Sequence, residues 1–488
     1  MPDILHQPYW LTMGPLLVVS VTAFVVMILE FIFLHGNRRW LVWPSLLGTL
    51  VAMVPAVQHF AAKPTAALNT MLVDGFASVF SLLILISAAL ILLFSYAYSA
   101  RQPLAAEHTY LILFGVAGAL AMASAFDLIT LYVGLELLSV ASYVLIAVRK
   151  KSVRSVEGGV KYLIMGSVGS AALLYGMSFI YGISGTTNLV ELGQHGSELY
   201  QQYPAIVLLG FILMLCGMGF KLSLVPFHMW TPDAYDGAPS PISSFLATLS
   251  KTAAFAMLLR MLLFIFNGVT SDVFYWAGIL AAVTMLVGNL IALPQRNMKR
   301  LLAFSSIAQA GYALIPLALI GPNYTDWTGL FDSLVFYLFA YTFMTIGAFA
   351  VVSVVARARK THTDDALQGL FQQSPWLAGA LTVFLLSLAG MPLTGGFLGK
   401  FYIFVETIHF QAVWLGILLF VTSIISFYYY LGWVRQMFRK DLDTRGEAAV
   451  IQTHPVMNLL LGLCIAGTLA LGIVPATLLH PLQWVQWF

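Results

Sequence analysis

Four charged side chains lie in the middle of long apolar stretches of this 488-residue sequence: Glu136, Lys221, Lys251 and Lys400. Placing one such charge at the centre of a membrane helix costs about 2.5–3.5 kcal/mol, so the four together cost on the order of 10 kcal/mol. That sum is comparable with the net stability of a typical domain. We therefore expect these groups to face the protein interior or water, to pair with one another and to take part in the protein's function.

The residue types predict proton transfer. Burial among apolar side chains lowers the pKa of a lysine, whereas a nearby carboxylate raises it. A change in hydration, or in the distance to the carboxylate, therefore switches a lysine between holding and releasing a proton. We expect Lys221, Lys251 and Lys400 to form a relay along the bilayer midplane, with Glu136 as the counter-ion and Lys221 as its partner.

Other polar groups in the apolar stretches keep a structural interpretation beside the functional one. Lys161 lies about one turn into a predicted helix, where it either extends to the membrane surface or belongs to the relay. His228 either hands protons to the cytoplasm or closes a helix end through a hydrogen bond. We expect Arg260, beyond Lys251, to extend to the membrane surface, and Asp74 to cap a helix.

The composition identifies the environment of these charges. The chain is 60% hydrophobic and only 9% charged, whereas soluble proteins contain about 25% charged residues. Since the shortfall extends over the whole length, we predict an all-α polytopic membrane protein. Cys216 and Cys464 both lie in apolar runs, and no CxxC or Cys/His cluster occurs, so we expect no disulfide framework and no metal or iron–sulfur site.

Apolar stretches of roughly 20 residues predict fourteen transmembrane helices. Their expected ranges are 12–34, 40–61, 76–98, 108–126, 127–148, 158–182, 205–234, 242–267, 273–294, 301–320, 329–356, 375–405, 412–438 and 456–480. No Lys or Arg precedes the first apolar run, so we expect the first helix to be retained and not cleaved as a signal peptide.

The distribution of Lys and Arg predicts the orientation. If all fourteen stretches cross, seventeen of these residues fall on one side and Lys63 alone falls on the other. The seventeen are Arg38, Arg39, Arg101, Arg149, Lys150, Lys151, Arg154, Arg296, Lys299, Arg300, Arg357, Arg359, Lys360, Arg435, Arg439, Lys440 and Arg445. By the positive-inside rule this side is cytoplasmic, and both termini lie on the periplasmic side.

Two of the predicted helices, the seventh and the twelfth, are interrupted. Lys221 stands shortly before Pro226, and Lys400 follows Pro392 and two glycines. Paired broken helices in matching positions indicate a transport path. Because the two are five helices apart, they run in opposite directions, which predicts inverted five-helix repeats. We expect an N-terminal segment at 1–107, a first repeat at 108–267 (helices 4–8), a second repeat at 268–411 and 412–440 (helices 9–13), and a C-terminal helix within 441–488.

The stretch GFKLSLVPFHMWTPDAYDGAPSPISSFLATLSK, residues 219–251, resembles the antiporter-like subunits of bacterial NADH–quinone oxidoreductase (respiratory complex I), and among them the subunit N family. LYVGLELLS at 131–139, NMKRLLAFSSIAQAGY at 297–312 and MPLTGGFLGKFY at 391–402 support the resemblance. Subunit M has a glutamate where Lys400 stands, and the sequence after the fourteenth helix is too short for the lateral helix of subunit L.

The resemblance implies a fourteen-helix fold that moves protons while quinone is reduced elsewhere in the complex. It implies roles in proton movement for Glu136, Lys221, Lys251 and Lys400, and for Lys161 in the same half-channel as Lys221. Gln309 stands where some relatives have a histidine. Since an amide does not titrate, a relay at that position needs water or the amide itself as a bridge.

The resemblance also implies the chain's surroundings. We expect no cofactor in this chain, and FMN, iron–sulfur clusters and quinone in partner subunits. The expected partners are subunit M, the small subunits K and J, and the lipid bilayer of the bacterial inner (plasma) membrane, without nucleic acid. Two alternatives stay open: a subunit of a multi-subunit sodium/proton antiporter, against which the WTPD segment argues, and a structural membrane spacer.

Overall fold

The structure is a computed structural model that describes residues 13–33, 38–60, 64–100, 107–266, 271–320, 327–439 and 451–485. Four residues of the predicted charge distribution, Lys63, Arg101, Lys440 and Arg445, lie outside the described residues. Within the described part, twelve helices are long and apolar enough to cross a membrane, and two shorter apolar helices cover His108–Ala123 and Pro375–Ala389. The chain is therefore an all-helical, multi-pass membrane protein.

The first half of the chain contains one small hairpin and a series of long helices. Strand β1 (Thr65–Ala67) pairs antiparallel with β2 (Met71–Val73), with Ala66 opposite Leu72. The helices are α2 (Gly14–Ile32), η1 (Arg38–Leu41), α3 (Val42–Gln58), α4 (Gly75–Ser99), α5 (His108–Ala123), α6 (Leu128–Ile146), α7 (Val153–Ser184), α8 (Leu189–Gln202), α9 (Pro204–Leu222), α10 (Thr231–Gly237), α11 (Ser240–Ala247), α12 (Leu249–Arg260) and the π-helical segment η2 (Met261–Ile265).

The second half consists mainly of helices joined by short connections. Its elements are α13 (Ser271–Ala292), α14 (Met298–Ala318), α15 (Thr328–Arg359), η3 (Asp364–Leu367), α16 (Leu370–Gln373), α17 (Pro375–Ala389), α18 (Gly395–His409), α19 (Val413–Phe438), α20 (Pro455–Ile473) and α21 (Ala476–Leu482). Each of the fourteen predicted apolar ranges overlaps at least one of the helices. The number of membrane crossings itself stays a prediction.

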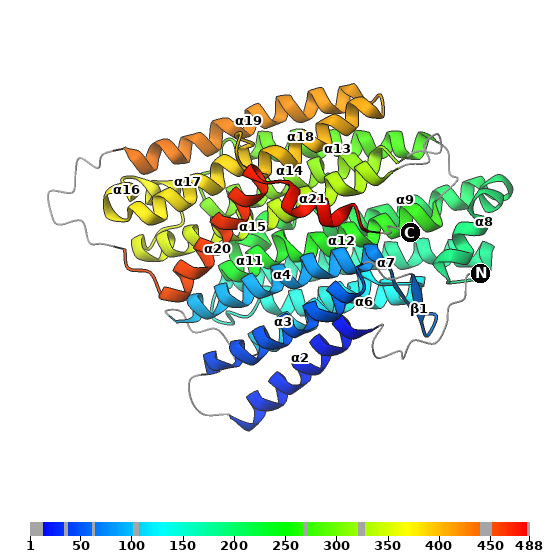
Figure 1. Ribbon diagram of the computed structural model, residues 1–488, viewed down its shortest axis with the longest axis horizontal. Helices are drawn as coiled ribbons and strands as arrows, with labels where there is room; N and C mark the ends of the chain where they lie inside the picture. Colours follow the sequence, from blue (N-terminus) through cyan, green and yellow to red (C-terminus); the bar gives the residue numbers. More distant parts are fainter. Residues whose placement is uncertain are drawn as a thin grey trace.

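The long helices lie side by side, with α2 and α3 at one edge, α19 at the opposite edge, and α11, α12, α14 and α15 between them (Figure 1). These central helices are almost entirely buried, whereas α2, α3 and α7 expose most of their apolar side chains. Since lipid tails are as apolar as these side chains, an outward apolar surface suits a bilayer. The central helices are therefore the ones that can keep polar groups away from lipid.

Helices end abruptly at two places inside the bundle. α9 ends at Leu222, where Ser223 has a left-handed φ of 63°, and α10 begins only at Thr231. α17 ends at Ala389, followed by Gly390 with a φ of 94°, a conformation that favours glycine. The carbonyl groups of the last helical turn have no partners within the helix. Each end therefore leaves acceptors inside the protein.

A third interruption was not predicted. The span predicted at 242–267 corresponds to one candidate span, Ser240–Ile265, but its helix is interrupted, because α11 stops at Ala247 and α12 begins at Leu249. The residue between them, Thr248, has φ −108° and ψ −77°, and its hydroxyl donates to the Ser244 carbonyl at 2.8 Å. Such bonds from threonine to the preceding turn compete with regular helix geometry. No proline or glycine marks this position in the sequence.

Candidate functional site

Lys221 occupies the last turn of α9, and its side chain is buried. Its amine donates hydrogen bonds to the Ser139 hydroxyl of α6 at 2.9 Å and to the Tyr162 hydroxyl of α7 at 3.0 Å. The Tyr162 ring packs against Trp230 at a centroid distance of 4.3 Å and against Phe220 at 5.5 Å. The lysine therefore lies in an aromatic enclosure with two neutral hydroxyl partners.

Glu136 lies one turn before Ser139 on α6 and is half-buried. Its carboxylate accepts a hydrogen bond from Ser170 of α7, and the Tyr132 hydroxyl lies 3.1 Å from the same serine oxygen. Within the described residues, Glu136 and Lys221 do not form an ion pair with a nitrogen–oxygen distance of 4.0 Å or less. The two groups instead bind hydroxyls at neighbouring positions between α6 and α7.

Lys251 follows the unpredicted interruption at Thr248 and is buried. Its amine donates to the Ser306 backbone carbonyl at 2.6 Å and to the Ser306 hydroxyl oxygen at 2.7 Å, both on α14. The hydroxyl of Tyr341 on α15 donates to the same serine oxygen at 2.8 Å. Ser306 therefore joins Lys251 to a buried tyrosine.

Lys400 lies on α18 and reaches back to the end of α17. Its amine donates to the Leu388 carbonyl at 2.9 Å and to the Ala389 carbonyl at 3.2 Å, and it lies 4.7 Å from the centroid of the Tyr312 ring. Carbonyl groups at a helix C-terminus carry partial negative charge and favour a cation. A Cβ at Gly390 would lie 3.3 Å from Cδ of this lysine, so the glycine permits the close approach.

Gln309 is the position at which the sequence predicts water or an amide as a bridge in the relay. Its side-chain oxygen accepts a hydrogen bond from the Tyr337 hydroxyl, and its Nε2 donates to the Leu388 carbonyl at 3.2 Å. That carbonyl also accepts from Lys400. Gln309 stands one turn after Ser306 on α14, so one face of this helix contacts the partners of both Lys251 and Lys400.

The sequence did not predict three of these partners, which are Ser306, Tyr337 and Tyr341. The tyrosines stand one turn apart on α15, with nearly parallel rings at a centroid distance of 6.3 Å. A weak signal exists, since Ser306 and Gln309 are polar residues three apart in a largely apolar helix and therefore lie on one face.

Lys161 and His228 share no hydrogen-bond partner with Lys251 or Lys400 within the described residues. The Lys161 amine contacts Glu157 at 2.6 Å and Asp233 at 2.8 Å, and the side chain is 44% exposed. Arg300 of α14 contacts the other oxygen of Asp233 at 2.6 Å. His228 is buried between α9 and α10, and its Nδ1 has no hydrogen-bond partner among the described protein atoms.

The expectation that Arg260 extends to the membrane surface is wrong. Its side chain is 0% exposed, and Nη2 contacts the Asp74 carboxylate at 2.9 Å while Nε donates to the Ala123 carbonyl at 3.0 Å. Asp74 also accepts from the Ala77 backbone N–H at 2.7 Å, so the predicted cap of α4 is confirmed. The expectation failed because Asp74 stands 186 residues away in the sequence.

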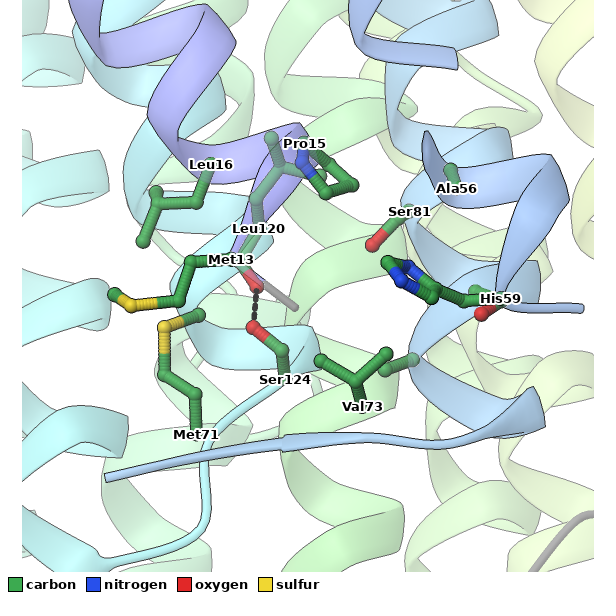
Figure 2. A pocket seen from close by; sticks show the side chains of 12 residues that line it. Met13, Pro15, Leu16, Ala56, His59, Met71, Val73, Ser81, Leu120 and Ser124 are labelled. Carbon is green, nitrogen blue, oxygen red and sulfur yellow. Dashed lines mark hydrogen bonds between the residues drawn. The ribbon is translucent and has the colours of Figure 1, made fainter. Parts of the chain in front are cut away.

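A small cavity lies between α2, α3, α4, α5 and β2 (Figure 2). His59 and Ser81 line it, together with Ser124, whose hydroxyl donates to the Leu120 carbonyl at 2.8 Å. None of the predicted relay residues lines this cavity. Its walls come from the N-terminal helices and from the ends of α4 and α5.

The comparisons with known proteins decide the family. A family model described as "NADH:quinone oxidoreductase/Mrp antiporter, TM" matches residues 125–426. NADH-quinone oxidoreductase subunit N of Geobacillus sp. (strain WCH70) is 39% identical over 499 residues, which cover 98% of this chain and 99% of the relative. The chain belongs to the subunit N family of NADH–quinone oxidoreductases. It is thus a membrane subunit of a proton-translocating enzyme.

Solved structures agree with this assignment. A chain of respiratory complex I from Thermus thermophilus is 31% identical, with a TM-score of 0.80 and coverage of 96% of this chain and 100% of that chain. A chain of the Mrp complex from Dietzia sp. has a TM-score of 0.83 over 97% of this chain and 96% of that chain, but it is only 22% identical. The second likeness shows a shared fold alone.

Proposed function

We propose that the chain translocates protons across the bacterial membrane through a buried Lys/Glu relay, coupled to quinone reduction elsewhere in the complex. One observation carries the proposal. Ser306 and Gln309, on one face of α14, contact Lys251 and the carbonyl that also binds Lys400. The hydrogen-bonded groups around these two buried amines thus lie one helical turn apart on the same face of α14, in the centre of the protein.

The partners of the lysines suit proton exchange. A hydroxyl group both donates and accepts, so Ser139, Tyr162 and Ser306 can hydrogen-bond with an amine in either protonation state. Gln309 does not titrate, and it holds Tyr337 and the Leu388 carbonyl in place. Water next to the lysines completes the transfer between stations.

The break after α9 provides the entry for water. Ser223 Oγ, His228 Nδ1 and Thr231 Oγ1 are buried there without hydrogen-bond partners among the described protein atoms. Buried polar atoms are generally hydrogen-bonded to protein or to ordered water. We assign this break as the cytoplasmic entry to Lys221, with His228 at its mouth. Glu136 adjusts the charge of Lys221 through the hydroxyls of α6 and α7, and Lys161 lies at the cytoplasmic rim.

The proposed topology has fourteen crossings. Helices 4–8 (108–267) and helices 9–13 (268–411 and 412–440) form two inverted repeats, with 1–107 before them, a final helix within 441–488, and both termini on the periplasmic side. The matching ends of α9 and α17, each near a buried lysine, support the repeats. Subunits M, K and J are the proposed neighbours, and FMN, iron–sulfur clusters and quinone belong to partner subunits.

The test uses the assembled enzyme in sealed vesicles. Lys400→Ala is expected to abolish most proton pumping per NADH oxidised, because it removes the amine that shares the Leu388 carbonyl with Gln309. Lys221→Ala is expected to do the same. Arg154→Met, a change of an exposed charge, serves as the control for both. Undiminished pumping in the two lysine variants would refute the relay.

A sodium/proton antiporter subunit is the second candidate, because the Mrp chain shares the fold. Purification from the native membrane separates the two. Partners that carry flavin and iron–sulfur clusters support the complex I function, whereas a set of membrane subunits without redox centres supports the antiporter.

A further inference from the structure

Lys299 lies at a helix end, as the charge distribution predicted, but its side chain is only 3% exposed. It stands in the first turn of α14. Its amine donates to the backbone carbonyls of Tyr235 at 3.0 Å, of Asp236 at 3.1 Å and of Ala238. These carbonyls lie at and just beyond the C-terminal end of α10. Lys299 therefore closes the short helix that follows the break beside Lys221.

The helix α10 depends on such outside support. It has seven residues, and isolated helices shorter than about 12–15 residues are marginal. Its last carbonyls lack partners within the helix, and a cation there is favourable. Asn297 Nδ2 donates to the Asp236 carboxylate at 2.9 Å, and Arg300 contacts the Asp233 carboxylate at 2.6 Å. Three residues within the first turn of α14 and its N-cap thus join the start of α14 to α10.

The number of acceptors distinguishes Lys299 from the relay lysines. An ammonium group has three N–H donors, and a neutral amine has two. Among the described residues, Lys221, Lys251 and Lys400 each have two hydrogen-bond acceptors. Lys299 has three. All three donors of an ammonium group therefore have acceptors at Lys299, and the amine is held at three points to the end of α10.

The same helix leads to the centre of the relay. Ser306, which binds Lys251, stands about two turns after Lys299 on α14, and the Tyr235 hydroxyl of α10 lies 3.5 Å from the Ser306 hydroxyl. Movement of α10 against α14 would therefore change both the break beside Lys221 and the contact of Lys251.

We propose that Lys299 is a positioning residue: a tether that fixes α10 to α14 and so holds the entry break beside Lys221 and the contact of Lys251 with Ser306 in register. The inference rests on the proposed function, since it concerns the alignment of the same relay.

The test compares Lys299→Met with Arg154→Met in the assembled enzyme. Arg154 also faces α10, with its guanidinium 3.9 Å from the Asp236 carboxylate, but it is 71% exposed. Two quantities are measured: protons pumped per NADH oxidised in vesicles, and backbone hydrogen exchange of residues 231–238. For Lys299→Met we expect the pumping ratio to fall to about half or less, with NADH oxidation retained and faster exchange in α10. Arg154→Met should change neither.

Each other outcome overturns the tether. The tether is refuted if Lys299→Met leaves both the pumping ratio and the hydrogen exchange unchanged. It is also refuted if NADH oxidation and pumping fall in proportion, because such a loss indicates a structural role only. If Lys299→Met does not assemble, Lys299→Gln keeps two of the three donors and is measured instead. Failure of both to assemble also rejects a coupling role. If Lys400→Ala still pumps protons, the relay itself is refuted. If Lys400→Ala loses pumping while Lys299→Met pumps normally, only the tether is refuted.

Discussion

The protein buries cations in two regions and gives them different partners. At the end of α12, Arg260 faces the carboxylate of Asp74 and a backbone carbonyl. Along α9, α12 and α18, Lys221, Lys251 and Lys400 face hydroxyls and carbonyls instead. All of these side chains are buried. Burial alone therefore does not separate the two regions, but the chemistry of the partners does.

The difference has a physical reason. Arginine stays protonated in proteins, and a carboxylate 2.9 Å away binds it as a fixed pair. A lysine among neutral hydroxyls can lose its proton without leaving an opposite charge unpaired, and both of its forms remain hydrogen-bonded. An ion pair thus serves to hold α4 against α12, whereas neutral partners leave an amine able to exchange protons.

Asp74→Ala should have the largest effect, because it leaves the Arg260 guanidinium buried without its counter-charge. Breaking one partner of a buried pair costs about 3–5 kcal/mol. We expect a strong loss of assembled enzyme and a lower unfolding temperature, measured by native electrophoresis and thermal denaturation. The double variant Asp74→Leu with Arg260→Met should recover much of the loss, since an apolar pair of similar size is often neutral. A single variant as stable as the wild type would contradict a structural role for the pair.

Lys251→Met should have the opposite profile. The substitution leaves the Ser306 oxygens short of one donor, which costs about 1–3 kcal/mol, and no opposite charge is left unpaired. We therefore expect assembly close to normal with proton pumping largely lost, measured as protons per NADH oxidised in vesicles. If pumping falls only as far as the amount of assembled enzyme, the distinction between the two regions is lost.

Much of this arrangement follows from the sequence, because its signals are local. A lysine in an apolar stretch stands out because placing its charge inside a membrane costs free energy. Pro226 and Pro392 mark the helix ends near Lys221 and Lys400. The cap at Asp74 is equally local. These features place the charges on helices but do not give their partners.

The remaining features depend on contacts between distant parts of the chain. Asp74 meets Arg260 across 186 residues, and Lys251 meets Ser306 across 55. The interruption at Thr248 has no proline or glycine to mark it. Lys299 looks like a helix-end charge in the sequence, and only the folded chain surrounds it with three carbonyls. Periodicity cannot supply such information, because it describes one helix at a time.

Gln309 offers a finer test of the link between Lys251 and Lys400. Gln309→Leu removes one hydrogen bond to Tyr337 and one to the Leu388 carbonyl. A neutral hydrogen bond is worth about 1 kcal/mol, so each of the two lost bonds corresponds to about a fivefold lower pumping rate. Gln309→His retains a donor and an acceptor and should pump faster than Gln309→Leu. Equal rates in the wild type and the leucine variant would show that the path does not use this amide.

Lys161 should show the smallest effect, and it tests where the rule of neutral partners stops. Its amine is 44% exposed and contacts two carboxylates, Glu157 and Asp233. Solvent screens exposed ion pairs, so they contribute little to stability, and Lys161→Met should assemble normally and keep most of its pumping in the vesicle assay. Glu157→Gln is the matched control, because it removes one of the two carboxylates and keeps the amine. Pumping lost in Lys161→Met but not in Glu157→Gln would mean that this amine exchanges protons despite its ionic partners. Exposure to water, and not the charge of the partner, would then decide which lysines belong to the relay.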